Sequence, residues 1–304
     1  MAETQAELGA TIRILTPAEG VYAYYDGRIP GVRAYSAAPN WLDDGAYEVG
    51  IASYALVSGE AALVYDTHIS EAHARLIRSH LEGLGVRDIR VVLSHWHDDH
   101  VAGNAVFRDC EIIANRATAD LMAENRVKLE TGTPPIAPLV MPTRLFENTL
   151  SLSVGSIDVE LHQADIHSRD GTLLWIASRR LLLCGDTLED TVTFVSEAER
   201  LAEHLRDLQA MPRFGATRIL PNHGAEAVIA AGGYDPSLIA ATERYVRKLL
   251  RCPSDPALAA EDLRDFIADD LASGALTWFE PYAAVHRANV EVVLAAAGSA
   301  PVEG

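Results

Sequence analysis

The chain has 304 residues, of which 49% are hydrophobic and 22% are charged, so it is long enough for one large domain with an appended piece. Its formal net charge of −18 repels polyanions, which argues against nucleic acid as a partner. The N-terminus is acidic and lacks an apolar segment, and no stretch approaches the roughly 18 apolar residues of a membrane span. We therefore expect a soluble, cytoplasmic protein with no membrane partner.

The first polar side chains of interest lie at the end of a predicted strand, residues 63–67. Asp66 is close to this end and His68 directly follows it. From there both side chains could orient the imidazoles of a metal site, and a simple turn role is the alternative. Residues 70–81 then have the apolar spacing of an amphipathic helix.

Residues 94–100, with the sequence SHWHDDH, concentrate metal-ligand side chains directly after the apolar run at residues 90–93. Alternate side chains of an extended segment point the same way, so His95 and His97 can bind one ion together. Asp99 and His100 come after the chain turns and point to a different position. The segment therefore predicts two adjacent metal positions, about 3.5 to 4 Å apart.

A proline-dense stretch at residues 133–142 follows a predicted helix near residues 115–130. Its prolines exclude regular structure, but it has too many apolar side chains for a solvated linker. Three interpretations stay open: a cap over the active site, a contact with a partner chain, or a loop laid across its own domain.

Two histidines compete for the role of a third histidine ligand. His162 is in phase with Asp158 and Glu160 on the wetter face of an alternating strand at residues 157–162. His167 lies in the turn beyond that strand. We therefore prefer His167 as the ligand.

Two further ligands follow short apolar strands. Residues 181–184 form a continuous apolar run of the kind that is buried on both faces, and Gly185 and Asp186 come next. Residues 218–220 end in the same way, in the sequence PNHG that contains His223. Open α/β sheets place their sites just beyond strand ends, so these groups are expected to meet.

After Gly232 and Gly233 the pattern changes to helices. Residues 236–250, 257–271 and 282–297 each have helical spacing. These helices could supply a wall for the substrate or a contact in a homodimer. We divide the chain into a catalytic domain of residues 1–232 and a helical extension of residues 233–304 that packs on it.

The HxHxDH motif at residues 95–100 resembles that of the metallo-β-lactamase superfamily. The later ligands follow in a similar order, although Ile166 stands where the family usually has glycine before its third histidine. The resemblance implies an α/β fold, a four-layer αββα sandwich. It also implies a first ion bound by His95, His97 and His167, a second bound by Asp99, His100 and His223, and Asp186 as the bridge between them.

The mechanism expected from such a site is hydrolytic. Two divalent ions that share a water lower its pKa from 15.7 toward about 7, which makes hydroxide available at neutral pH. The hydroxide would attack a carbonyl, and Asp99 would orient it and carry a proton to the leaving group. Nitrogen and carboxylate ligands suit two zinc ions best, with iron, manganese or cobalt as alternatives.

We therefore expect a dinuclear zinc-dependent hydrolase that acts on a small-molecule ester, with a lactone as the favoured substrate. A β-lactam or thioester hydrolase, the latter similar to glyoxalase II, is the alternative, and a non-catalytic metal-binding protein is the third interpretation. A site for small acyl compounds needs apolar walls. Trp41, Tyr25 and Tyr47 in the N-terminal part are the candidates for that wall.

Overall fold

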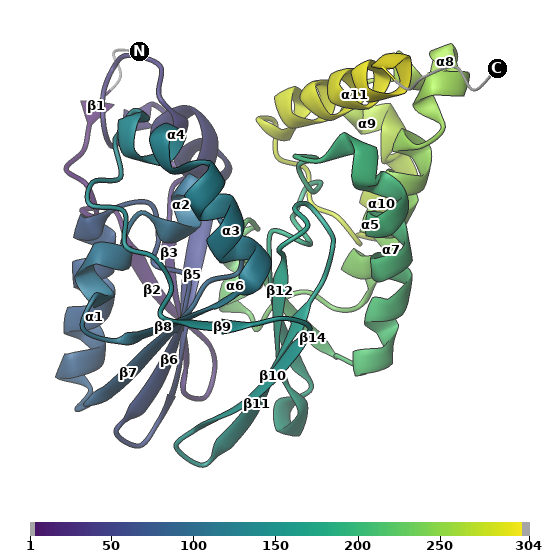
Figure 1. Cartoon of the computed structure of the whole chain (residues 1–304). Helices are drawn as coiled ribbons and strands as arrows, with labels where there is room; N and C mark the ends of the chain where they lie inside the picture. The colour runs from purple at the N-terminus through teal and green to yellow at the C-terminus, as the bar shows by residue number, and fades with distance from the viewer. Residues whose placement is uncertain (1–3, 300–304) are drawn as a thin grey trace.

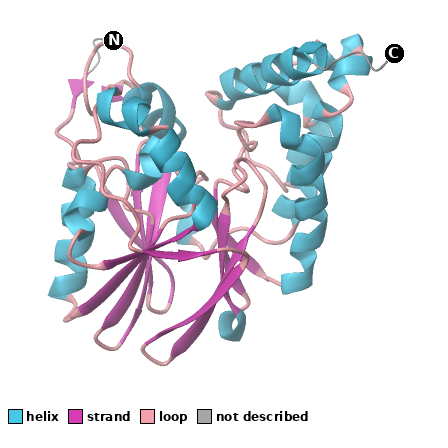
Figure 2. Cartoon of the chain, in the orientation of Figure 1, coloured by secondary structure: helices cyan, strands magenta, loops and turns pink. Residues whose placement is uncertain are grey.

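The computed structural model describes residues 4–299 and contains two large β-sheets that face each other (Figure 1). Helices α1, α3 and α4 lie on the outer side of the seven-stranded sheet, and α5 and α7 lie on the outer side of the five-stranded sheet (Figures 1 and 2). This arrangement is the αββα sandwich, so the predicted fold class is confirmed. Residues 1–3 and 300–304, at the ends of the two predicted domains, lie outside the described residues.

The strands of the described residues fall into three sheets. The seven-stranded sheet has the order β2 (Arg13–Ala18), β3 (Val21–Asp26), β5 (Ile51–Ser58), β6 (Ala61–Tyr65), β7 (Asp88–Val92), β8 (Glu111–Asn115) and β9 (Arg144–Phe146). The five-stranded sheet has the order β10 (Thr149–Val154), β11 (Ile157–Gln163), β12 (Thr172–Ile176), β13 (Leu181–Gly185) and β14 (Arg218–Pro221). The two short strands β1 (Thr4–Gln5) and β4 (Val32–Arg33) pair with each other.

The helices connect and cover these strands. The α-helices are α1 (Glu71–Gly83), α2 (Asp98–Val101), α3 (Arg116–Glu124), α4 (Arg126–Thr131), α5 (Leu201–Ala210), α6 (Glu226–Ala230), α7 (Ser237–Leu249), α8 (Pro256–Ala259), α9 (Leu263–Phe266), α10 (Ala268–Ser273) and α11 (Tyr282–Ser299). The other short helices are η1 (Leu42–Tyr47), η2 (Asn104–Phe107), η3 (Ala177–Arg179), η4 (Ala198–Arg200), η5 (Met211–Phe214) and η6 (Cys252–Ser254).

Parallel pairing brings the ligand-bearing strand ends to one edge. Strand β7 pairs in parallel with β6 and β8, and β13 pairs in parallel with β14. The segments that follow β6, β7, β13 and β14 therefore leave the two sheets on the same side. Gly185, at the end of β13, has a φ of +56°, and a Cβ there would lie 2.8 Å from the Cβ of Ser94. Glycine is needed at this position because the two sheets approach each other closely beneath the site.

The apolar core lies in two layers. One cluster fills the space between the sheets and extends beneath α5 and α7, and it contains Tyr54, Leu161 and Leu183. The other lies between the seven-stranded sheet and its outer helices, where α1 contributes Ile77 and Leu81. The predicted amphipathic helix at residues 70–81 is thus present. It begins after Ser70, whose hydroxyl accepts a hydrogen bond from the backbone N–H of His73.

The proline-dense stretch at residues 133–142 lies across its own domain. Ile136 and Leu139 are buried in the cluster beneath the outer helices of the seven-stranded sheet. The indole N–H of Trp41 donates to the carbonyl of Pro134 at 2.8 Å, and Asn104 Nδ2 donates to the carbonyl of Val140 at 3.0 Å. These contacts favour the interpretation as a loop laid across its own domain, and they explain why the stretch is apolar without regular structure.

The C-terminal helices differ from the prediction in their middle part. The expected helix at residues 257–271 is wrong, because the chain there forms the three short helices α8, α9 and α10. Asp262 interrupts the helical run, since its side chain accepts a hydrogen bond from the N–H of Asp265 at 3.0 Å and so begins a new helix. Helices α7 and α11 start and end within a few residues of the predicted positions.

Among residues 4–299, no helix combines the length and the apolar character that crossing a membrane requires.

Candidate metal centre

The structure brings the seven candidate ligands together at the edge where the strands end. They form two groups, and within each group the candidate ligand atoms lie within 4.8 Å of one another. The first group is His95, His97 and His167, and the second is Asp99, His100, Asp186 and His223. The segment after β7 supplies His95, His97, Asp99 and His100, whereas the five-stranded sheet and its connections supply His167, Asp186 and His223.

The three histidines of the first group direct ring nitrogens at one another. His95 Nε2 and His167 Nε2 each lie 3.0 Å from His97 Nδ1. His167 Nδ1 donates to the backbone carbonyl of Phe194 at 2.9 Å, which leaves its Nε2 with a lone pair. Burial holds the pKa of His95 and His97 well below the usual value and lowers that of His167 to about 4. Neutral imidazoles with converging lone pairs are the donor set that a divalent cation requires.

Asp186 lies between the two groups. Its Oδ2 is 3.1 Å from His100 Nε2 and 3.3 Å from His223 Nε2, and it is also 3.7 Å from His95 Nε2 and 3.8 Å from His167 Nε2. Its Oδ1 is buried and has no hydrogen-bond partner among the residues that the structure describes. A buried carboxylate oxygen without a partner is costly unless a cation binds it, so the site fits bound metal.

Opposite charges dominate the second group. Burial opposes the charged forms of Asp99 and Asp186, but the imidazoles of His100 and His223 outweigh it and hold the pKa of both carboxyl groups well below the usual value. In the same way, the carboxylates overcome burial and hold the pKa of His100 and His223 well above the usual value. Both aspartates are thus in the ionised form that binds metal.

A set of hydrogen bonds orients the ligands of the second group. Asp66 Oδ2 lies 3.0 Å from His100 Nδ1, and Asp66 Oδ1 accepts from the N–H of Ser94 at 2.6 Å. Asn222 Nδ2 donates to Asp66 Oδ2 at 2.6 Å, and His223 Nδ1 donates to the carbonyl of Gly50 at 2.7 Å. Asp66 was predicted for such a role, whereas Asn222 was not, although it directly precedes His223.

His68 does not orient a ligand, and this part of the prediction is wrong. Its Nε2 donates to the carbonyl of Tyr24 at 3.1 Å, and its Nδ1 accepts from the N–H of Ile69 at 2.9 Å. The ring stacks on that of His73 at 4.4 Å between centroids. With a φ of +71°, the residue turns the chain after β6, so the turn interpretation applies.

His162 and Ile166 clarify the choice of the third histidine. His162 lies on β11, and its Nε2 contacts Glu160 Oε2 at 3.0 Å rather than a candidate ligand. His167 has a φ of +68°, which directs its ring into the site. Ile166 is buried in the core between the sheets. The positive φ therefore falls on His167, and glycine is not needed at position 166.

A pocket of about 480 Å³ opens above the candidate ligands. Trp41, Phe194 and Val285 contribute apolar surface, and Lys128 and Glu48 contribute charge. Trp41 is thus on the pocket wall, and its contact with a substrate stays a prediction. Helix α11 supplies further small apolar residues, namely Ala284 and Ala288.

Tyr25 and Tyr47 do not line this pocket, which corrects their predicted placement. Tyr25 is buried in the core between the sheets, and its hydroxyl donates to the carbonyl of Gly224 at 2.9 Å. The Tyr47 hydroxyl is 2.9 Å from Thr11 Oγ1. Both rings pack in the protein core. Strand β3 is covered on both faces, and Tyr47, at the end of η1, is buried in a small apolar cluster.

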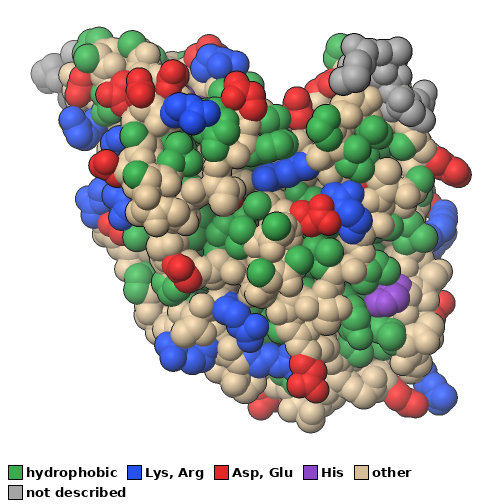
Figure 3. All heavy atoms as spheres, turned by 180° about the vertical axis from the view of Figure 1, so that it is seen from behind, with side chains coloured by type: hydrophobic (Ala, Val, Ile, Leu, Met, Phe, Trp, Pro, Cys, Tyr) green, Lys and Arg blue, Asp and Glu red, His purple; other side chains and the backbone are tan. Residues whose placement is uncertain are grey.

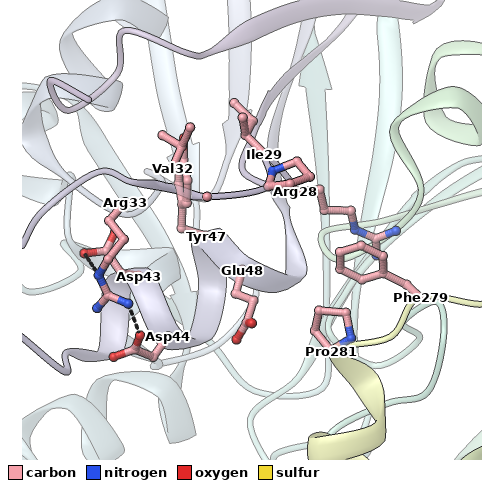
Figure 4. A pocket seen from close by; sticks show the side chains of 12 residues that line it. Arg28, Ile29, Val32, Arg33, Asp43, Asp44, Tyr47, Glu48, Phe279 and Pro281 are labelled. Carbon is pink, nitrogen blue, oxygen red and sulfur yellow. Dashed lines mark hydrogen bonds and ion pairs between the residues drawn. The ribbon is translucent and has the colours of Figure 1, made fainter. Parts of the chain in front are cut away.

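A neighbouring cavity of about 340 Å³ has Tyr47 on its wall and shares Asp44, Glu48 and Pro281 with the pocket (Figure 4). Figure 4 shows the Arg28 guanidinium against the ring of Phe279, and its carbon is 4.2 Å from the ring centroid. Arg28 also donates to the carbonyl of Asp190 at 2.8 Å. These contacts fasten the segment before α11 to the N-terminal half of the chain.

The fold and the ligand set together define a protein class. A family model described as the metallo-beta-lactamase superfamily matches residues 46–223. The chain belongs to this superfamily. The predicted family is confirmed.

Individual relatives are distant. The chain is 24% identical over 180 residues to the beta-lactamase-like protein 2 homolog of Caenorhabditis elegans, a match that covers 58% of this chain and 56% of the relative. The chain thus spans about half the length of the curated relative that it matches. Its structure is similar to that of VMB-1, with a TM-score of 0.60, 16% identity and coverage of 78% of this chain and 97% of the other.

A metallo-beta-lactamase from Pontibacter korlensis is also similar, with a TM-score of 0.56 and 16% identity over 76% of this chain and 99% of the other. At such identities the likeness of the structures shows the fold alone.

Asp170, at the turn before β12, provides a test of the electrostatics around the site. It is buried, and burial raises its pKa from 3.8 to about 6. The pKa of Asp170 is higher in the folded protein than in the unfolded chain. Its contribution to the stability of the folded protein is therefore fully present below about pH 4 and is lost as the pH rises through 6. As the pH rises from 4 to 7, the free energy of unfolding of Asp170→Asn should therefore increase relative to that of the wild type by up to about 3 kcal/mol.

Urea unfolding of both metal-free proteins at several pH values would measure this difference. A difference in the free energy of unfolding that stays constant from pH 4 to 7 would contradict the predicted titration of Asp170.

Proposed function

We propose that the protein is a dinuclear zinc-dependent hydrolase that cleaves a small ester, with a lactone as the favoured substrate. The observation that carries the proposal is the pair of ligand groups joined by Asp186 at the base of a pocket with apolar walls. Seven ligand side chains in this arrangement are typical of two-metal hydrolytic sites.

The donor set supports zinc as the metal. Five imidazoles and two carboxylates offer nitrogen and oxygen ligands, which suit zinc and also accept iron, manganese or cobalt. When bound, two such cations would lower the pKa of a water and polarise the substrate carbonyl. His95, His97 and His167 would hold one cation, Asp99, His100 and His223 would hold the other, and Asp186 would contact both.

Asp99 is the candidate for proton transfer. It lines the pocket, and its side chain is 17% exposed, whereas that of Asp186 is 4% exposed. Its Oδ2 lies 3.3 Å from His223 Nε2, and its Oδ1 lies 3.4 Å from His100 Nε2. The carboxylate can accept a proton at an oxygen from the attacking water and pass it to the leaving group.

The remaining charges around the pocket support an uncharged substrate. Beyond the candidate ligands, the pocket wall carries the carboxyl groups of Asp44, Glu48, Asp98 and Glu189 and the ammonium group of Lys128. A carboxylate-bearing compound would meet more negative than positive groups there. An ester or lactone without a charge avoids this repulsion, and its alkyl part can contact Phe194 and α11.

Lys128 is the observation that favours the alternative, a β-lactam hydrolase, because its ammonium group could attract the carboxylate of such a substrate. It lies 4.8 Å from the ring centroid of Trp96 at the side of the pocket. A thioester hydrolase would use the same metal chemistry. We propose no nucleic-acid partner, because the formal net charge of −18 repels polyanions, and on the face seen in Figure 3 acidic side chains lie among the basic ones.

A substrate panel tests the proposal. The protein, loaded with zinc, would be assayed with lactones, linear esters, thioesters, β-lactams and phosphodiesters, with chelator-treated protein as the control. We expect zinc-dependent turnover that is highest for uncharged lactones or esters. Preferred cleavage of β-lactams would support the alternative, and efficient cleavage of phosphodiesters without activity on any acyl compound would overturn the proposal.

The metal content is a separate prediction. Because the ligands form two groups with Asp186 between them, elemental analysis of gently purified protein should approach two ions per chain. A reproducible value at or below one, even after metal addition, would contradict the dinuclear site.

A further inference from the structure

Helix α11 is fastened to the loop that follows the bridging ligand. We call residues 187–196, between Asp186 and η4, the Glu189 loop. The Tyr282 hydroxyl donates to Glu189 Oε2 at 3.0 Å. Further along the same helix, Asn289 Nδ2 donates to the carbonyl of Thr193 at 2.9 Å, and Asn289 Oδ1 accepts from the N–H of Val195 at 2.8 Å. Tyr282 and Asn289 are fully buried.

The same loop holds a metal-ligand candidate. The backbone carbonyl of Phe194 accepts the hydrogen bond from His167 Nδ1 at 2.9 Å. Phe194 itself is fixed by its N–H, which donates to Glu189 Oε1 at 2.8 Å. Ser196 Oγ donates to the backbone carbonyl of His167 and so joins the end of the loop to the ligand segment.

We infer that α11 is a positioning element for the metal centre, in which Tyr282 and Asn289 hold the Glu189 loop so that the Phe194 carbonyl orients His167. The inference rests on the proposed metal site. A carbonyl that accepts from Nδ1 fixes the tautomer of the imidazole and keeps the Nε2 lone pair directed at the ion. The two side chains hold residues on both sides of Phe194, so its carbonyl cannot rotate away without breaking one of these hydrogen bonds.

The inference assigns a role to the C-terminal helices. They lie beyond the residues that match the family model, which end at 223. Helix α11 does more than supply part of the apolar pocket wall. Its buried polar side chains Tyr282 and Asn289 bind the Glu189 loop, which follows Asp186 in the sequence and contacts His167. Loss of these groups should weaken one metal position and leave the other nearly unchanged.

Zinc affinity measures this effect directly. Competition with a chromophoric chelator would give the two zinc affinities of the wild type, Tyr282→Phe, Asn289→Ala and Val293→Ala. Val293 is the matched control, since it is also buried on α11 but has an apolar side chain that forms no hydrogen bond with the loop. We expect Tyr282→Phe and Asn289→Ala to lower the affinity for one of the two zinc ions by about 10- to 100-fold, the usual effect of removing a group that orients a ligand.

The absorption spectrum of the cobalt-substituted proteins provides a second readout, because it reports the geometry of the ligands. It should change in Tyr282→Phe and Asn289→Ala and match the wild type in Val293→Ala. Wild-type affinities in both polar variants, equal weakening of both ions, or the same loss in Val293→Ala would overturn the inference. A wild-type protein that takes up no zinc would overturn the proposed function and this inference with it.

Discussion

Asp186→Ala is expected to lower zinc occupancy at both positions and to abolish measurable hydrolysis. Its Oδ2 lies within 3.8 Å of ring nitrogens from both ligand groups. Removal of the carboxylate also leaves His100 and His223 without their main negative partner. Since loss of a group that merely orients a ligand costs about 10- to 100-fold in metal affinity, loss of the bridge should cost more than about 100-fold. Elemental analysis and the chelator titration would measure the change.

His162→Ala is the control for this experiment. His162 was the competing candidate in the sequence, and its side chain contacts Glu160 outside the centre. It should retain the zinc content and activity of the wild type. If Asp186→Ala kept both ions, or lost only one of them, Asp186 would not be a bridge.

Asp99→Asn should reduce turnover of the best substrate by about 10² to 10⁴-fold, the usual contribution of a positioned acid or base. The amide keeps one oxygen for the metal but cannot accept and release a proton. Because Asp99 is also a ligand, zinc content has to be measured in the same preparation, and the expected result is a fall in kcat that exceeds any fall in occupancy.

Asp88→Asn provides the comparison for Asp99→Asn, because Asp88 lies at the exposed start of β7, the strand that precedes the ligand motif. Its replacement should leave kcat unchanged. A fully loaded Asp99→Asn protein with the turnover of the wild type would remove Asp99 from the mechanism and leave proton transfer to another group of the pocket.

Most of the candidate ligands could be recognised from the sequence because they follow short apolar strands, and strand ends of parallel pairs meet at one sheet edge. His167 differs, because it follows β11, a strand of alternating polar and apolar residues that pairs antiparallel with both of its neighbours. Local pattern was less reliable for the aromatic residues. Tyr25 lies on β3, and both faces of this strand are covered, so no periodicity distinguishes a core position from a pocket wall. The broken helix at residues 257–271 shows the same limit, since helical spacing does not reveal that Asp262 caps a new helix.

The groups that support His167 had no signal in the sequence. Glu189 and Tyr282 are 93 residues apart, and Asn289 and Val195 are 94 residues apart. Each belongs to a residue type that is common in loops and helices. Their pairing depends on where α11 docks, and a single sequence does not specify that docking.

The division of the ligands between the two sheets has a consequence for folding. The segment after β7 extends from the seven-stranded sheet, whereas His167, Asp186 and His223 belong to the five-stranded half. At the opposite edge, Ser58 Oγ accepts from the N–H of Ser156 and ties the two halves together by a hairpin contact. Bound cations would link the two sheets at the end of the sandwich that carries the candidate ligands. Metal at 100 times its dissociation constant would then add about 2.7 kcal/mol to the free energy of unfolding for each site, so zinc supply would set the lifetime of the protein as well as its activity.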